Sequence, residues 1–239
     1  MKIREKIKTI CLENKEEESC GIISMDDTGN FFIKQLENVH VEKNKYFKIS
    51  LSEWIKEKNK NKILAVFHSH TNTPENPSSF DIDYSEELCI PFIVYSIYTD
   101  KFFLHFPESY EPEKLAGRFY IEDIHECTCL IKDYFDKKLD LKISKWLKNY
   151  CIPKDAIEAN ELFKKVFQKN MQEVNKINEI KKHDVLIFKF SDNKKMHGGI
   201  YLGDEIFLHQ KTNQISSRTF LDQRWKSKIY KIFRHKALV

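Results

Sequence analysis

The chain has 239 residues, and its 40 Lys and Arg against 36 Asp and Glu leave a formal net charge of only +4. These charges are interspersed, which argues against nucleic-acid binding, and six cysteines are too few for a disulfide scaffold in a chain of this length. No apolar run approaches the roughly 20 residues of a membrane span, and the N-terminal residues resemble an amphipathic helix rather than a signal peptide, so we expect folding in a reducing cytoplasm.

The first half of the chain alternates between helical and extended patterns. Apolar periodicity predicts helices over 2–14, 50–58 and 80–88, and strands over 20–25, 31–35, 63–70, 92–98 and 102–106. Ser50 is expected to cap its helix, with Glu53 as the reciprocal partner. This order of elements predicts an α/β or α+β sandwich.

A candidate metal site lies at the end of the strand expected over 63–70. His68 and His70 are two residues apart, so their side chains share one face of that strand. Asp81 follows after ten further residues and can complete a set of three ligands. Three protein ligands leave the fourth tetrahedral position of a Zn²⁺ ion for water, which is the layout of a catalytic site.

Two further residues fit the chemistry of such a site. Glu18 is the candidate base that takes a proton from the water, and Ser78 is the candidate donor to the oxyanion of a tetrahedral intermediate. The run of three glutamates at 16–18 leaves the base open by one or two positions and also fits a solvated surface, and Asp83 is a second candidate near Asp81.

The pattern Glu18-x-Cys20-Gly21, then His68-x-His70, then Pro77-Ser78 and Asp81, resembles the JAMM metallopeptidase family over about residues 1–106. The resemblance implies that His68, His70 and Asp81 hold zinc, that Glu18 is the acid/base and that Ser78 steadies the oxyanion. It also implies cleavage of peptide or isopeptide bonds beside ubiquitin-like folds. The family's usual proline after the second histidine is Thr71 here, a change that removes no ligand.

A polar, proline-interrupted segment at 107–118 predicts a boundary between domains at 1–107 and 118–239. Beyond it, the pattern favours a helix over 127–135 and one or two more within 154–178. Short strands are expected over 184–190, 198–202, 206–209 and 229–233. The second domain is therefore expected to pack helices on an antiparallel sheet, and the whole chain belongs to the α+β class.

Cys127 is the candidate nucleophile of this second domain. It begins an amphipathic helix, whose dipole favours the thiolate, and it needs a histidine from elsewhere as its base. His197 is the best candidate, and His209 could orient its ring. Cys129 ranks below Cys127 because it is expected on the polar face of the helix; a buried structural thiol or a Cys-x-Cys metal pair are the alternatives.

This second set resembles the NlpC-type cell-wall peptidases, a papain-like group, over about residues 118–239. The matching segments are 126–135, 184–188, 197–204 and 207–209. The resemblance implies Cys127 as nucleophile, His197 as base and His209 as the third member, with a peptide bond of peptidoglycan as substrate. Glu126 and Cys129 depart from the Asp and the small residue that the family usually carries there.

A JAMM-like unit followed by an NlpC-like unit resembles the K-type tail assembly proteins of long-tailed phages. This resemblance implies a tail-tip protein made in the host cytoplasm and carried in the virion. Its partners would be other tail proteins, one of them with a ubiquitin-like domain, and peptidoglycan. A structural assembly factor without activity and a ubiquitin-like deconjugase are the other hypotheses.

Overall fold

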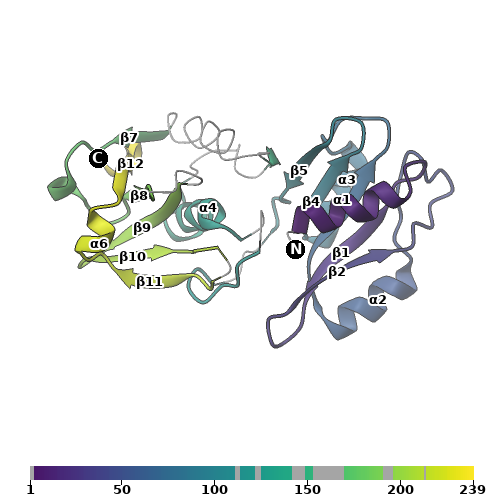
Figure 1. The fold of residues 1–239 in the computed structure, drawn as a ribbon, viewed down its shortest axis with the longest axis horizontal. Coiled ribbons are helices and arrows are strands. Elements are labelled where there is room, and N and C mark those ends of the chain that lie inside the picture. Colours follow the sequence, from purple (N-terminus) through teal and green to yellow (C-terminus); the bar gives the residue numbers. More distant parts are fainter. Residues whose placement is uncertain are drawn as a thin grey trace. The chain divides into compact units, whose positions relative to one another are not determined.

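The computed structural model describes residues 3–110, 114–121, 125–141, 149–152, 170–190, 196–212 and 214–239 (Figure 1). The chain divides into two compact units, one of residues 1–111 and 148–152 and the other of residues 112–147 and 153–239. The helices expected within 154–178 fall mostly outside the described residues; from 170 onward the structure has a short strand and a 3-10 turn. In the part of the chain that is described, no helix has the length and apolarity needed to cross a membrane.

The first unit is built on a mixed six-stranded sheet with the order β2-β1-β3-β4-β5-β6. Its strands are β1 (Cys20–Met25), β2 (Phe31–Leu36), β3 (Lys62–His70), β4 (Phe92–Ser96), β5 (Lys101–His105) and β6 (Asn149–Ile152). Only the β3–β4 pair is parallel among these described strands. The sequence did not predict β6, which comes from beyond the linker and adds to the edge of the first sheet.

Three helices cover this sheet: α1 (Ile3–Glu13), α2 (Leu51–Lys60) and α3 (Ser79–Leu88). One face of the sheet presents Val66 and Phe92 to a core that also takes in Trp54 of α2 and Tyr84 of α3. The other face lies against α1, which crosses in front of the strands in Figure 1. Because side chains alternate along β3, His68 and His70 share the face of Val66, toward α2 and α3.

The predicted capping box at the start of α2 is wrong. Ser50 is the N-cap residue, but its side chain makes no capping hydrogen bond. The Glu53 carboxylate instead accepts a hydrogen bond from the backbone N–H of Glu37, at 2.8 Å. A full capping box occurs at α3, where Ser78 and Asp81 bond each other's backbone N–H.

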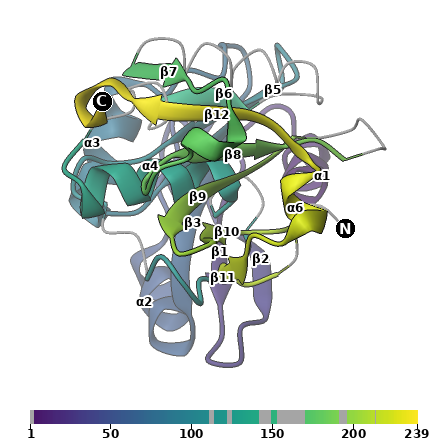
Figure 2. The same cartoon turned by 90° about the vertical axis from the view of Figure 1, so that its left-hand side faces the viewer.

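The second unit contains an antiparallel six-stranded sheet with the order β11-β10-β9-β8-β12-β7 (Figure 2). Its strands are β7 (Met171–Glu173), β8 (Val185–Phe188), β9 (His197–Gly203), β10 (Ile206–His209), β11 (Ser217–Phe220) and β12 (Ile229–His235). The helices are α4 (Cys127–Lys138) and α6 (Gln223–Lys226), with 3-10 turns η2 (Ile177–Glu179) and η3 (Lys236–Leu238). A mixed sheet with flanking helices in one unit and a helix on an antiparallel sheet in the other confirm the predicted fold class.

Helix α4 fixes the second unit's core. Leu130, Ile131 and Phe135 of α4 are fully buried and pack with Val185 of β8 and Ile200 of β9. The first turn of the helix lies near the start of β9, because Cys127 and Ile131 are close to Gly198, the residue after His197. Packing of one helix face thus brings together two segments that are far apart in the sequence.

Candidate active sites

The pairing of β1 with β3 explains why the glutamate and the two histidines belong to one site. Cys20 pairs with His68 in antiparallel register, and at the next position the Ser69 N–H donates to the Ser19 carbonyl while the Ser19 N–H donates to the Ser69 hydroxyl. Continuing this register places Glu18 opposite His70, on the same face of the sheet. The Glu18 backbone is held on both sides, because its N–H donates to the Lys43 carbonyl and its carbonyl accepts from Asn38.

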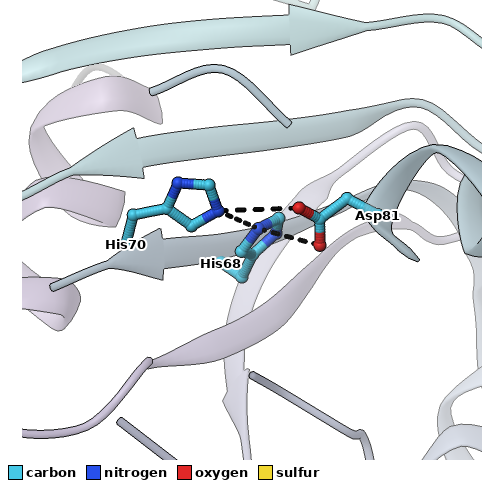
Figure 3. A group of neighbouring side chains, drawn as sticks. All are labelled: His68, His70 and Asp81. Carbon is cyan, nitrogen blue, oxygen red and sulfur yellow. Dashed lines mark hydrogen bonds and ion pairs between the residues drawn. The ribbon is translucent and has the colours of Figure 1, made fainter. Parts of the chain in front are cut away.

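The side chains of His68, His70 and Asp81 converge, as Figure 3 shows, with the histidines from β3 and the carboxylate from α3. The Nε2 atoms of the two rings are 3.2 Å apart, and the Asp81 oxygens lie 3.3 Å from His68 Nε2 and 3.5 Å from His70 Nε2. Ligands at 2.0–2.1 Å in a tetrahedron around Zn²⁺ are separated by about 3.3–3.4 Å. The two nitrogens, and each nitrogen with its nearer Asp81 oxygen, therefore have the spacing of ligands around one zinc ion. Among the described residues, this is the one group of three such side chains close enough to share an ion.

Neighbouring groups fix the orientation of both rings. His70 Nδ1 lies 2.7 Å from the carbonyl oxygen of Pro74, so it carries the proton and leaves the Nε2 lone pair for a metal. The His68 ring stacks on Phe47 at 4.3 Å, and its Nδ1 has no hydrogen-bond partner among the described residues. All three candidate ligands are buried.

Asp81 is held as an ionised ligand. Burial raises its pKa, but the nearby His68 and the hydrogen bonds from His68, His70 and Ser78 prevail and hold the pKa far below its ordinary value. The Ser78 hydroxyl and backbone N–H both donate to Asp81 Oδ2, each at 2.7 Å. In this structure Ser78 is therefore the partner of a candidate metal ligand, and its role at an oxyanion stays a prediction.

Glu18 is 5% exposed, and burial raises the pKa of its carboxyl, while the nearby His68 and His70 partly offset that rise. It lies beside a cavity of about 260 Å³ that Asn38 and Lys43 also line. A carboxyl whose pKa is raised toward neutrality is suited to accepting and returning a proton. Glu16 and Glu17 are more exposed than Glu18, so the structure favours Glu18 as the candidate base.

The second unit brings Cys127 and His197 to the walls of one cavity of about 380 Å³. Cys127 is the first residue of α4 and is partly exposed. Gly198 lies beneath the thiol, because a Cβ at this position would lie 4.0 Å from Cys127 Sγ and 2.7 Å from the end of Ile131. The small residue after His197 thus makes room for the thiol and the helix that carries it.

A chain of hydrogen bonds runs from His197 away from the thiol. His197 Nε2 lies 2.8 Å from His209 Nδ1, and His209 Nε2 lies 2.8 Å from Thr219 Oγ1. When each Nε2–H donates along this chain, Nδ1 of His197 is the ring atom left to accept a proton. Burial first, and then the positive charges of His209 and Lys211, lower the pKa of His197 to about 3. The ring is therefore neutral at physiological pH, as a base must be.

Three neighbours of this second site could not be recognised from the sequence. Thr219 lies on β11, a short edge strand for which no pattern was seen. The ring centre of Trp225 lies 5.0 Å from that of His209 and 6.1 Å from that of His197. Lys211 has its Nζ 5.1 Å from the centre of the Trp225 ring. The one sign of these three neighbours in the sequence is that they follow His209 in the chain.

Cys129 lies on the face of α4 that carries Asp133, as expected, but this face is buried. Cys129 is 3% exposed, and burial raises the pKa of its thiol to about 12. A thiol with such a pKa is protonated at neutral pH and is a poor nucleophile or metal ligand. The structure therefore keeps Cys127 as the candidate nucleophile.

Comparison with known proteins matches each half of the chain to a family model. Residues 2–106 match the model for prokaryotic homologs of the JAB domain, the domain of the JAMM metallopeptidases, and residues 119–234 match the NlpC/P60 family. No curated protein matches the chain.

Two solved structures are weakly similar to this chain. One is the solution structure of protein DSY2949 from Desulfitobacterium hafniense, with 22% identity, a TM-score of 0.34, and coverage of 42% of this chain and 77% of its own. The other is a protein from Salinibacter ruber, with 15% identity, a TM-score of 0.30, and coverage of 47% of this chain and 92% of its own.

The two family models agree with the predicted two-domain layout: the chain carries a prokaryotic JAB domain followed by an NlpC/P60 domain.

Proposed function

We propose that this chain is a hydrolase with two separate sites. It would act in the assembly of a phage tail and in the entry of the phage into its host. The JAB site would be a zinc-dependent peptidase or isopeptidase that processes a tail protein with a ubiquitin-like domain. The NlpC/P60 site would be a cysteine endopeptidase that cuts peptides of peptidoglycan. The observation that carries this proposal is that one chain with two peptidase-family domains has a converging His68–His70–Asp81 group in the first domain and a cavity lined by Cys127 and His197 in the second.

In the JAB domain, His68, His70 and Asp81 would hold the zinc ion. When bound, zinc polarises a carbonyl and lowers the pKa of its water to about 7. Glu18, on the same face as His70, would accept the proton of that water and pass it to the leaving amine. Ser78 would keep Asp81 in place through two hydrogen bonds to Oδ2.

In the NlpC/P60 domain, the Cys127 sulfur would attack the carbonyl carbon of the scissile bond while its proton moves to Nδ1 of His197. The amine would leave with that proton, and the thioester at Cys127 would then be hydrolysed by water. His209 would hold the imidazole through Nε2 and share the positive charge that forms, with Thr219 as its own acceptor.

Digestion of purified muropeptides and of a candidate tail-protein partner tests both roles. We expect wild-type protein to cut both substrates, His68→Ala to lose only the cleavage of the protein, and Cys127→Ala to lose only the cleavage of muropeptides. Retention of both activities in both variants would show that the residues are misassigned. Absence of any cleavage by wild-type protein loaded with zinc would favour the structural assembly factor.

A further inference from the structure

A second cavity adjoins the thiol site. It has a volume of about 300 Å³ and is lined by Phe190, Lys211, Asp222, Arg224, Trp225 and Lys228. Phe190 and Lys211 also line the cavity that holds Cys127 and His197. The two cavities are therefore adjacent, with Lys211 and Phe190 between them.

This second cavity carries a net positive charge, because three cations and one carboxylate, that of Asp222, line it. Lys211, Arg224 and Lys228 are exposed, and within the described part of the chain none of them forms an ion pair. Nearby Lys226, in contrast, is paired with Glu205 at 2.6 Å. The Asp222 carboxylate in the lining is engaged as the N-cap of α6, where it accepts the Trp225 N–H at 3.0 Å.

Aromatic rings hold two of these cations over the cavity. Lys211 Nζ lies 5.1 Å from the centre of the Trp225 ring, and Lys228 Nζ lies 4.8 Å from the centre of the Phe190 ring. Such contacts orient an ammonium group without neutralising its charge. Trp225 also packs against His209 and His197. The Lys211 ammonium group, which lies over the same Trp225 ring, is therefore close enough to both imidazoles to act on them electrostatically.

We propose that Lys211, Arg224 and Lys228, on the floor made by Phe190 and Trp225, form a subsite for a carboxylate of the peptide that is cut at Cys127. This Lys211 subsite rests on the proposed function of the cysteine site and names its substrate class, an acidic peptide with a free carboxylate close to the scissile bond. An anion there also offsets the charge that lowers the pKa of His197, so it favours the imidazolium that forms when the thiol gives up its proton.

Alkylation of Cys127 by a matched pair of reagents tests this subsite without a known substrate. Iodoacetate carries a carboxylate and iodoacetamide the neutral amide, and mass spectrometry of digests gives the rate at each cysteine. We expect the ratio of the iodoacetate rate to the iodoacetamide rate to be higher at Cys127 than at the exposed Cys89. Lys211→Gln should lower that ratio by about fivefold, the scale of one nearby charge. Lys189→Gln, which removes an exposed lysine over Tyr230 outside both cavities, should leave it unchanged.

The two proposals fail in different ways. If Cys127 reacts with iodoacetamide no faster than Cys89, the nucleophile itself is misassigned. If Cys127 is fast but its ratio is the same in wild type, Lys211→Gln and Lys228→Gln, the cysteine site stands and the subsite is wrong. If inorganic phosphate suppresses the iodoacetate preference at concentrations where acetate does not, the cavity is a phosphate site, which also overturns the carboxylate proposal.

Discussion

Two hydrogen bonds that end on one oxygen of Asp81 determine how this carboxylate faces the histidines. Both come from Ser78, one from its hydroxyl and one from its backbone N–H. The backbone bond belongs to the cap of α3 and survives any substitution, whereas the hydroxyl bond depends on the serine. Residues that orient a metal ligand in this way typically contribute 10- to 100-fold to metal affinity.

We therefore expect Ser78→Ala to weaken zinc binding by about tenfold, because Asp81 loses one of the bonds that hold it. Competition with a zinc-binding dye measures the affinity directly. Ser79→Ala is the matched control, since Ser79 is the neighbouring exposed serine and is not a partner of Asp81. Unchanged affinity in Ser78→Ala would limit this serine to a role in the reaction itself.

At the second site, Thr219 is the last member of the hydrogen-bond chain behind His197. Thr219→Val keeps the shape but removes the acceptor of His209, so the ring loses its orientation. We expect the rate of Cys127 alkylation by iodoacetamide to fall by several fold and its pH profile to change. Thr219→Ser, which keeps the hydroxyl, should restore both; equal rates in all three proteins would show that Thr219 has only a packing role.

At the scale of elements, the site residues could be predicted because strong local patterns carry them. The histidines end a long apolar strand, and Cys127 begins an amphipathic helix, so periodicity alone placed both. Strands β6, β7 and β11 could not be predicted, because they are short edge strands; β11, for example, has no buried residue. The Ser50 cap was wrong because a backbone donor elsewhere, Glu37 N–H, engages Glu53 instead.

Contacts between elements could not be predicted from the sequence either. Nothing in the pattern of 210–230 shows that Lys211 and Trp225 lie beside the imidazoles, since that depends on how β10, β11 and α6 return to the sheet.

The contacts of Gly21 could be predicted in part. It belongs to the motif Glu18-x-Cys20-Gly21, and the structure supplies the reason: a Cβ there would lie 2.2 Å from the Lys34 carbonyl and 2.5 Å from the Phe67 ring.

Gly21→Ala should consequently destabilise the JAB domain by at least about 3 kcal/mol, because the backbone of β2 cannot move aside without breaking the sheet. Thermal unfolding and zinc content measure the loss. Reactivity of Cys127 in the same protein is an internal control and should persist, since that thiol belongs to the other unit. A protein that binds zinc normally with alanine at this position would contradict the register of β1 between its neighbours.

At the scale of the whole molecule, the two domains should respond differently to pH and to metal. Burial lowers the pKa of His197 to about 3 and of His209 to about 4, against 6.5 for an ordinary histidine. Between these values the unfolded chain binds more protons than the folded one, so the stability of the NlpC/P60 domain is complete above pH 6.5 and falls as the pH drops below it.

Each of these two histidines should contribute a slope that approaches about 1.4 kcal/mol per pH unit near pH 5. Denaturant unfolding at a series of pH values measures the slope. His197→Asn removes one titrating group and should flatten the dependence by about one proton. An unchanged slope in the variant would show that His197 is not buried as a neutral ring.

The central claim is that one domain binds a metal ion through His68, His70 and Asp81, whereas the reactive thiol of the other domain requires no metal ion. Zinc content per chain, measured on purified wild-type, His68→Ala and Cys127→Ala proteins, tests it most directly. We predict one zinc ion per chain in the wild type and in Cys127→Ala, and a loss of that ion in His68→Ala. Zinc retained after His68→Ala, or lost after Cys127→Ala, would contradict this account.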